Sequence, residues 1–485
     1  MESLKEKTAK GMFWGGLGNG VQQLIGLLFG IYLARKLAPE DYGMMAMISI
    51  FSLIATALQN SGFTAALANI KNPRHEDYNS VFWFNIIVAC ILYTILFFCA
   101  PLIAEFYHTE RLVPLCRYAF LSIIVAGLGT SQSAYLFKNL MARSQAKAGM
   151  AAVLLSSITG AVMAWQGMAY WSLATQGLVY VSVCTGMQWA MSPWRPTLHI
   201  DFGPVRHMFR FSCKILITTI ITHINTNVLN VLLGRFFTKT DAGQYFQAYQ
   251  WDSKCVYLVQ GMVQQVAQPV LAGLNGEDDR QLNALRKMMR FTAFVSFPLL
   301  FGLSMVSEEF ILVTIKEKWL FSAHLLSVLC IAGAVMPLCT LLSNTVISKG
   351  RSDVYMWCTV ILGAVQIALM VILRHHGISL MVTAYTIVNI IWLFVWHHFA
   401  GRFTAYSLAM FLRDTLPFAL AAAGVMVATA LLTAWIEVMW VLLAARIVLA
   451  AVLYFVVMKV ARVKILDECM AFVTAKRKGN NIKQG

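Results

Sequence analysis

The first long apolar run of the sequence carries a stripe of uncharged polar side chains. Asn19, Gln22 and Gln23 are followed by Gly26 and Gly30, and spacings of three, four and seven place them on one face of a helix. Polar side chains inside a lipid-spanning helix are costly, so they mark pathways for substrates or ions. The stripe therefore predicts a face that lines a transporter interior, although small residues also serve close helix packing.

Two later segments repeat this arrangement with different side chains. An offset of 200 residues maps the first stripe onto a second set that again shares one helical face: Thr219, Thr222, His223, Thr226 and Asn230. The next run is more polar, and its residues recur at intervals of three and four: Gln250, Lys254, Tyr257, Gly261, Gln264 and Gln268. Amides and amines gathered on one face suit a sugar, which offers many hydroxyls and little charge.

Four cations fall within apolar runs, and few acids oppose them. Lys214 lies near the inner end of its run, Arg117, Lys254 and Arg446 lie toward the outer side, and Asp252 is the acid expected among them. A net positive interior favours an anionic ligand such as a diphosphate, which arginine binds through paired hydrogen bonds. Structural alternatives stay open. Arg117 and Lys214 could snorkel to lipid headgroups, Lys254 could pair near the outer surface, and Arg446 could serve packing or lipid contact.

The composition assigns these polar positions to a membrane protein. Of the 485 residues 59% are hydrophobic and 12% are charged, against about a quarter charged in soluble domains. Runs of roughly 20 apolar residues recur, each long enough to cross a bilayer as a helix. They predict an all-α polytopic membrane protein with 14 spans, at about 12–34, 43–66, 79–103, 112–136, 148–166, 169–191, 210–233, 247–271, 288–306, 321–345, 355–373, 379–400, 415–434 and 438–459.

The placement of lysine and arginine predicts the orientation of the spans. Most of these cations lie in segments on the side of the N-terminus, which the positive-inside rule assigns to the cytoplasm together with the C-terminus. The same bias accounts for most of the net charge of +16, so the charge does not indicate a nucleic-acid partner. The basic tail AKRKGNNIK is expected to rest near anionic headgroups, which makes membrane lipids expected partners.

One short element occurs twice and indicates an internal duplication. LARKLAPEDYG at 33–43 returns as LGRFFTKTDAG at 233–243, and both copies keep Leu, Arg, Asp and Gly at the same four places. Convergent loop chemistry is the alternative. Within the first turn, Asp41 is expected to cap the following helix, and Gly43 is expected to let that helix begin tightly.

The span count agrees with a duplication. Six spans precede residue 200 and six follow it, so the two copies share one orientation and predict two lobes related by a pseudo-twofold axis along the membrane normal. The two remaining spans close the chain. The expected domains are an N-lobe at 1–200, a C-lobe at 201–401, and the last two spans with a basic cytoplasmic tail at 402–485.

Several other chemistries lack their signatures in this sequence. There is no Walker-type GxxxxGK[ST] loop, so no ATP site is expected. The cysteines form no CxxC pair, and the tandem histidines His375-His376 and His397-His398 lie at span ends, so no metal site is predicted. The hydrophilic segments are too short to fold as catalytic domains. We therefore predict a transporter without catalytic residues or cofactors, whose coupling to a proton or sodium gradient stays open.

The stretch GMFWGGLGNGVQQLIGLLFGIYLARKLAPEDYGMMAMISIF resembles the opening of the Wzx-type polysaccharide exporters. The shared features are an uncharged Gly/Asn/Gln first span and the LAR-L-P-DYG turn, and both LMARSQAKAG and GMAYWSLATQGLV further along also fit. These exporters form the polysaccharide-transport branch of the multidrug/oligosaccharidyl-lipid/polysaccharide (MOP) flippase superfamily. The resemblance extends through the twelve duplicated spans.

This resemblance implies a flippase of the bacterial inner membrane that works by alternating access between two six-helix bundles. The implied substrate is an undecaprenyl-diphosphate-linked oligosaccharide, the repeat unit of a polysaccharide or O-antigen, which moves from the cytoplasmic to the periplasmic leaflet. Glycan polymerases and glycosyltransferases are further implied partners. The residues carried over as diphosphate or sugar contacts are Arg117, Lys214 and Lys254.

Three rival functions stay open at this point. A cation-coupled drug antiporter of the same superfamily would need a titratable carboxylate inside a lobe, and the first lobe has none in its predicted spans. A membrane glycan polymerase or glycosyltransferase would carry a large outer loop, whereas the longest one here is about 307–320. A lipid II flippase would differ in that its loss arrests growth.

Overall fold

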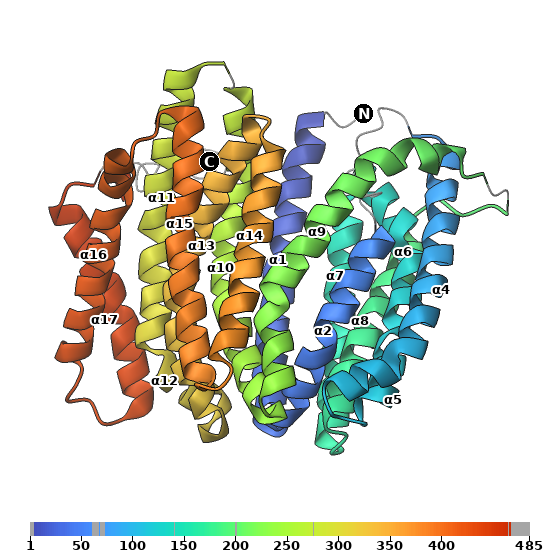
Figure 1. Cartoon of the computed structure of the whole chain (residues 1–485), viewed down its shortest axis with the longest axis horizontal. Helices are drawn as coiled ribbons and strands as arrows, with labels where there is room; N and C mark the ends of the chain where they lie inside the picture. The colour runs from blue at the N-terminus through green and yellow to red at the C-terminus, as the bar shows by residue number, and fades with distance from the viewer. Residues whose placement is uncertain are drawn as a thin grey trace, which may run out of the picture. The chain divides into compact units, whose positions relative to one another are not determined.

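The structure is a computed structural model that describes residues 4–60, 67, 73–139, 141–198, 201–274, 276–463 and 465–466, leaving aside the side chains of some of them, chiefly 4–13 and 206–218. The described residues form helices joined by short connections, as the composition predicts (Figure 1). The chain divides into two compact units, Met1–Phe246 and Gln247–Gly485. They are called unit 1 and unit 2 below, and each is considered by itself.

Unit 1 is built around packed pairs of long helices. α7 packs against both α1 and α8, α6 packs against α4 and α8, and α9 packs against α2 and α4. An apolar core that includes Met47, Ile103 and Phe120 lies where α2, α4 and the α5–α6 connection meet. The helices are α1 (Leu4–Lys36), α2 (Pro39–Asn60), α4 (His75–Phe106), α5 (Leu112–Ala119), α6 (Leu121–Lys138), α7 (Ala142–Trp165), α8 (Tyr170–Met191) and α9 (Gly203–Phe236).

Unit 2 follows from α10 (Lys239–Gly273), whose first residues belong to unit 1. α13 packs against α11 and α15, α16 packs against α11, and α17 packs against α16 and α12. The helices after α10 are α11 (Asp278–Met305), α12 (Ser307–Ile315), the 3-10 turn η1 (Glu317–Trp319), α13 (Leu320–Ser348), α14 (Ser352–Leu373), α15 (Ile378–Thr404), α16 (Leu408–Leu432) and α17 (Met439–Val460).

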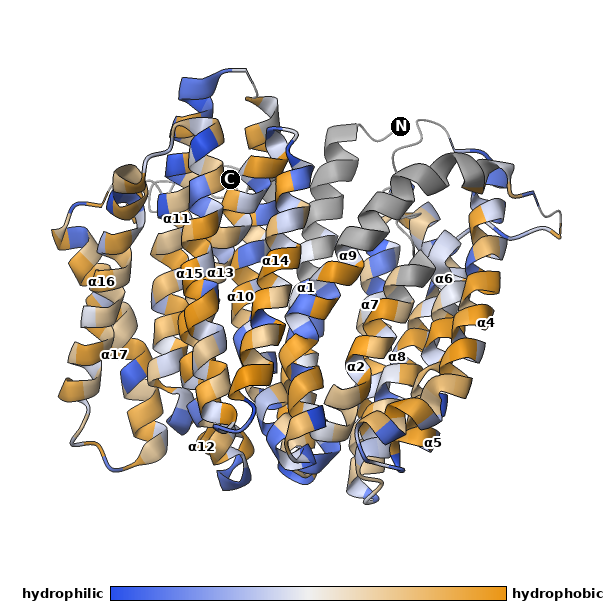
Figure 2. Cartoon of the chain, in the orientation of Figure 1, coloured by the Kyte–Doolittle hydropathy of each residue, from blue (hydrophilic) through white to orange (hydrophobic). Residues whose placement is uncertain are grey.

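Within the described residues, nine helical segments are long and apolar enough to cross a membrane. They comprise α4, α5–α6, α7, α11, η1–α13, α14, α15, α16 and α17. Figure 2 shows hydrophobic residues along most of α4, α16 and α17 and hydrophilic residues at helix ends. The chain is therefore an all-helical polytopic membrane protein. The other five predicted spans correspond to α1, α2, α8, α9 and α10, which are helical but are not among the nine. The end of the span predicted at 43–66 lies beyond Asn60, outside the described residues.

The two copies of the repeated turn lie against each other within unit 1. A Cβ atom placed on Gly43 would lie 2.0 Å from the carbonyl oxygen of Lys239, and one placed on Gly243 would lie 1.8 Å from that of Pro39. The contact is reciprocal: Gly43 faces the residue four positions before Gly243, and Gly243 faces the residue four positions before Gly43. Neither glycine has a positive φ. Glycine is thus required here because a second backbone comes close, and not to begin the helix as the sequence suggested.

Both turns also use their aspartate in the same way. Asp41 Oδ2 accepts a hydrogen bond from the amide of Ala38 at 2.9 Å, which confirms the predicted capping of α2. Asp241 Oδ2 accepts from the amide of Thr238 at 3.3 Å, and Thr238 Oγ1 accepts from the amide of Asp241 at 3.1 Å. This second pair is a complete capping box, which satisfies two free amides at the start of α10.

Candidate functional site

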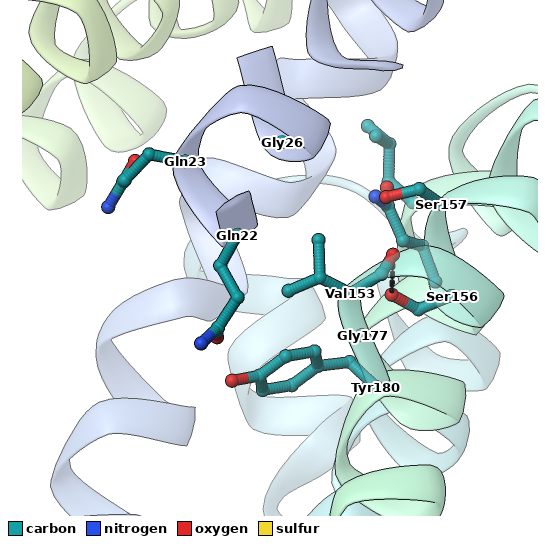
Figure 3. A pocket seen from close by; sticks show the side chains of 10 residues that line it. Gln22, Gln23, Gly26, Val153, Ser156, Ser157, Gly177 and Tyr180 are labelled. Atoms are coloured by element: carbon teal, nitrogen blue, oxygen red, sulfur yellow. Dashed lines mark hydrogen bonds between the residues drawn. The ribbon is translucent and has the colours of Figure 1, made fainter. Parts of the chain in front are cut away.

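Three helices of unit 1 line an open cavity of about 480 Å³ with both polar and apolar side chains, called the α1–α7–α8 cavity below (Figure 3). Gln22 and Gln23, both predicted from the polar stripe of the first span, belong to its wall together with Gly26. Asn19, the third predicted residue of that stripe, is exposed and does not line it. The remaining wall comes from α7 and α8: Val153, Ser156, Ser157, Leu173, Gln176, Gly177 and Tyr180.

Small residues bring α1 and α7 together beside this cavity. A Cβ atom on Gly18 would lie 2.7 Å from Cβ of Ala146, so α1 and α7 touch at that level. A Cβ atom on Gly149 would lie 2.8 Å from the amide of Gln22. Close approach over glycine and alanine is typical of membrane helices. As a result the side chain of Gln22 lies directly against α7, and its Nε2 donates to the carbonyl of Gly18 at 3.2 Å.

The wall of the cavity offers hydrogen-bond donors and acceptors but no formal charge. Its polar groups are the amides of three glutamines, two serine hydroxyls and the hydroxyl of Tyr180, with no Lys, Arg, Asp or Glu among them. Ser156 donates to the carbonyl of Val153 at 3.1 Å, which leaves its oxygen free to accept. In Figure 3 Gln22 and Tyr180 extend toward the same side, and Gln23 points away from them. This chemistry suits a neutral ligand rich in hydroxyl groups.

The predicted residues of α9 lie apart from this wall. Thr222 is exposed and His223 is half-buried. Their carbonyl groups accept from Thr226 Oγ1 at 2.6 Å and from Asn227 Nδ2 at 3.1 Å. These bonds run along the helix, and neither Thr222 nor His223 lines the α1–α7–α8 cavity. Lys214 falls within α9, but its side chain lies outside the described residues.

Arg117 of α5 contacts α4 and does not line the cavity. Its guanidinium carbon lies 4.2 Å from the centre of the Phe97 ring, and the side chain is half-buried. Its Nε is buried and has no hydrogen-bond partner among the described residues. A guanidinium held over an aromatic ring keeps its outer nitrogens available for other acceptors.

The predicted residues of unit 2 follow the length of α10. Gln250 and Lys254 are half-buried one turn apart, and Gln264 is exposed. The Lys254 ammonium lies 4.2 Å from the centre of the Trp251 ring. The carboxylate of Asp252 is buried against Gly333 of α13. A Cβ atom placed on Gly333 would lie 2.3 Å from Asp252 Oδ1, so α10 and α13 are in close contact there.

Sequence reasoning missed a buried carboxylate at the start of α16. Asp414 is 1% exposed, and its oxygens accept from Arg286 Nε at 2.8 Å and from Arg290 Nε at 2.6 Å. Tyr406 donates to the same carboxylate at 3.2 Å. Burial and this carboxylate raise the pKa of Tyr406 well above its usual range, so the hydroxyl stays protonated. The signal was the i, i+4 spacing of two arginines on α11, which predicts a shared partner.

Arg446 of α17 also has an acidic partner. It forms an ion pair with Glu309 of α12, and its Nε lies 3.3 Å from Thr433 Oγ1. The pair is mostly shielded, with side-chain exposures of 16% for Arg446 and 10% for Glu309. The two residues are 137 positions apart. No local pattern could have joined them, and their pairing removes Arg446 from the expected surplus of positive charge.

The fold is that of MOP-superfamily transporters. It matches a structure of the lipid II flippase MurJ in an inward closed conformation with a TM-score of 0.75 and 16% identity, covering 93% of this chain and 99% of that one. An inward-facing multidrug resistance MATE family transporter matches with a TM-score of 0.64 and 14% identity over 79% of this chain and 94% of that one. At these identities the likeness establishes the fold alone.

The sequence itself establishes the family. Residues 32–324 match the model of a family described as polysaccharide biosynthesis proteins, and the chain belongs to that family. It is 24% identical to the teichuronic acid biosynthesis protein TuaB of Bacillus subtilis, over 81% of this chain and 82% of TuaB. The lipopolysaccharide biosynthesis protein WzxC of Escherichia coli is 24% identical over 73% and 72%. The succinoglycan biosynthesis transport protein ExoT of Rhizobium meliloti is 25% identical over 68% and 67%. These relatives confirm the resemblance seen in the first span and turn.

Proposed function

We propose that this protein moves undecaprenyl-diphosphate-linked oligosaccharide repeat units across the bacterial inner membrane by alternating access. Its family supplies the connection to polysaccharide biosynthesis, and its fold is shared with transporters. The observation that carries the proposal is the α1–α7–α8 cavity. This cavity of about 480 Å³ has amides and hydroxyls beside apolar groups in its wall and no formal charge, so it offers hydrogen-bond partners for sugar hydroxyls.

The proposed architecture has 14 spans, two six-helix lobes at 1–200 and 201–401, and two further helices at 402–485. The reciprocal contact of Gly43 and Gly243 supports a pseudo-twofold relation, because equivalent backbones meet in equivalent ways. Both termini are placed in the cytoplasm by the distribution of lysine and arginine. Cysteines introduced one at a time into the 33–43 turn and near the C-terminus would test this orientation, because a membrane-impermeant thiol reagent added outside should label only the turn.

The diphosphate is proposed to contact cations that lie outside the cavity wall. Arg117 and Lys254 each hold their charge over an aromatic ring, which fixes the side chain while leaving donors available. Lys214 is retained as a third contact on the basis of its position in the sequence. A bound substrate shifts the equilibrium between inward and outward states only if it binds them with different affinities. The coupling ion is left unassigned.

The decisive experiment removes one donor and acceptor pair from the cavity wall. Gln22→Leu should reduce export of the surface glycan about tenfold at unchanged protein level, because a sugar hydroxyl loses its partner. Lipid-linked repeat units should then accumulate. Gln166→Leu is the matched control, since this exposed glutamine ends α7 outside the wall and should leave export unchanged. Normal export from both Gln22→Leu and Tyr180→Phe would refute the assignment of the cavity.

The cationic contacts and the rival functions are tested separately. Arg117→Ala and Lys254→Ala should each slow export, and unchanged export from both would overturn the diphosphate contacts while leaving the sugar site intact. Deletion of the gene should remove one glycan without arresting growth, whereas arrest would favour a lipid II flippase. A drug antiporter would instead show lost resistance to cationic dyes in the deletion strain.

A further inference from the structure

A second cavity lies in unit 2, where α15 ends and α16 begins. It has a volume of about 590 Å³ and is called the α15–α16 cavity below. Its wall includes His397, His398 and Arg402 from the last turns of α15, Tyr406 from the connection, and Leu408 from the start of α16. None of these residues belongs to the proposed sugar site or to the proposed diphosphate contacts. The inference therefore goes beyond the proposed function.

The backbone around this cavity is held in one conformation. Ala405 ends α15 in the left-handed region with φ of 56°. A Cβ atom on Gly401 would lie 2.6 Å from the carbonyl oxygen of Tyr406, so the connection folds back tightly onto α15. Ser407 then caps α16 by accepting from the amide of Met410 at 3.3 Å. Three residues thus reverse the chain and fix the start of α16 beside the last turn of α15.

The wall of this cavity carries positive charge without a matching acid. Arg402 is exposed, and among the described residues no acidic side chain pairs with it. The nearby Asp414 is already bound by two arginines and Tyr406, and this cluster of four side chains carries a net positive charge. The N-terminus of α16 adds the positive end of its helix dipole. The site therefore favours an anion.

One ring nitrogen of a buried histidine in the wall lacks a hydrogen-bond partner among the described residues. His397 is 7% exposed, its ring lies 4.9 Å from that of Phe411, and its Nε2 is buried with no partner among the described residues. An unpaired buried ring nitrogen is costly, and buried polar groups are paired in nearly all native structures. The missing partner is the second observation that points to a ligand in this cavity.

Apolar side chains beside the cationic group indicate what carries the anion. Phe394 is 44% exposed and Leu408 is 48% exposed, and both belong to the cavity wall. α15 and α16 are two of the helices long and apolar enough to cross a membrane, so the connection between them lies at a membrane surface. A free anion would gain nothing from these apolar groups, whereas the glycerol and first acyl carbons of a lipid would cover them.

We propose that the α15–α16 cavity binds the headgroup of an anionic phospholipid, with phosphate oxygens facing Arg402 and His397 and the acyl chains passing along Phe394 and Leu408. The bound lipid is an accessory component of unit 2 and is not the transported substrate. It joins the last helix of the duplicated region to the first helix outside it.

Native mass spectrometry of the full chain, titrated with phosphatidylglycerol in detergent, tests this proposal. Arg402→Gln should weaken the apparent affinity about tenfold, because a hydrogen bond to a charged group is lost. His397→Phe should weaken it while keeping the ring contact with Phe411. Arg413→Gln is the matched control, since this exposed arginine of α16 lies outside the cavity wall and should bind like the wild type.

Three results would overturn the proposal. Arg402→Gln could bind phosphatidylglycerol as tightly as Arg413→Gln does. Phosphatidylethanolamine with the same acyl chains could bind as well as phosphatidylglycerol, which would remove the requirement for net negative charge. Inorganic phosphate at equal concentration could displace the lipid fully, which would make the cavity a site for a free anion. Glycan export in the Gln22→Leu variant is a separate measurement, so the two proposals can fail independently.

Discussion

The two units bury polar side chains of different kinds. Among the described residues, every buried polar side chain of unit 1 is neutral: examples are Asn85, Gln132 and Ser157. Unit 2 buries the carboxylates of Asp252, Glu309 and Asp414. The interiors of the two units therefore differ in charge.

The positions of the ion pairs explain much of this difference. Asp414 of α16 is held by α11, and Arg446 of α17 is paired with Glu309 of α12. Each pair joins one of the last two helices to an earlier helix of unit 2. The buried charges of unit 2 thus fasten its last two helices, α16 and α17, to earlier helices of the same unit. The neutral cavity of unit 1 remains free to serve a ligand.

Replacing the central carboxylate should have the largest effect on stability. Asp414→Leu should lower the free energy of unfolding by about 3–5 kcal/mol, because Arg286 and Arg290 lose the carboxylate that both of them bind in a partly buried site. The measurement is denaturation of the purified protein by sodium dodecyl sulfate.

The matched control introduces leucine at a buried polar position of unit 1. Asn85 is fully buried, and neither its Oδ1 nor its Nδ2 has a hydrogen-bond partner among the described residues. Asn85→Leu should therefore be neutral or stabilising, since it removes a buried polar group without stranding another. Equal losses in the two variants would break the contrast between a neutral interior and an ionic one.

The next prediction concerns the element that the two copies share. Gly243→Ala should lower the free energy of unfolding by about 1–3 kcal/mol or more, because the added methyl group meets the carbonyl of Pro39 at 1.8 Å and a backbone must move. Gly43→Ala should behave alike. Gly30→Ala in α1 meets nothing within 4 Å and should cost nothing. If only one of the two alanine variants loses stability, the two halves of the reciprocal contact do not contribute equally to the free energy of unfolding.

Much of this fold could be predicted from periodicity and charge, because membrane helices need long apolar runs and their ends collect cations. Gln22 and Gln23 were found for the same reason: an amide in an apolar run stands out. The rest of the cavity wall could not be predicted, because Ser156 and Tyr180 lie on helices that carry no comparable polar stripe. The burial of Asp414 was not predicted, because it lies at a span boundary beside Arg413, where a charged side chain is expected to be solvated. Long-range pairs such as Glu309 with Arg446 leave no pattern in the sequence.

The ion pair between Glu309 and Arg446 should contribute less than Asp414, since Glu309 pairs with one arginine and Asp414 with two. A double-mutant cycle with Arg446→Met and Glu309→Gln should give a coupling of about 0.5–3 kcal/mol in the free energy of unfolding, because each single variant strands one buried partner. The double variant should therefore be more stable than the sum of the single losses. A coupling near zero would mean that α17 is held by apolar packing alone.

The smallest predicted effect separates the hydroxyl of Tyr406 from its ring. Tyr406 is 1% exposed and donates to Asp414 at 3.2 Å, while its raised pKa keeps the hydroxyl protonated at neutral pH. Tyr406→Phe should cost about 1 kcal/mol in the free energy of unfolding, because Asp414 keeps both arginines and loses only its third donor. In the Asp414→Leu background the same substitution should cost less, since the acceptor is already gone. A loss that stays equal in both backgrounds would show that Tyr406 acts through packing, and the ionic cluster of unit 2 would then consist of Asp414 and its two arginines.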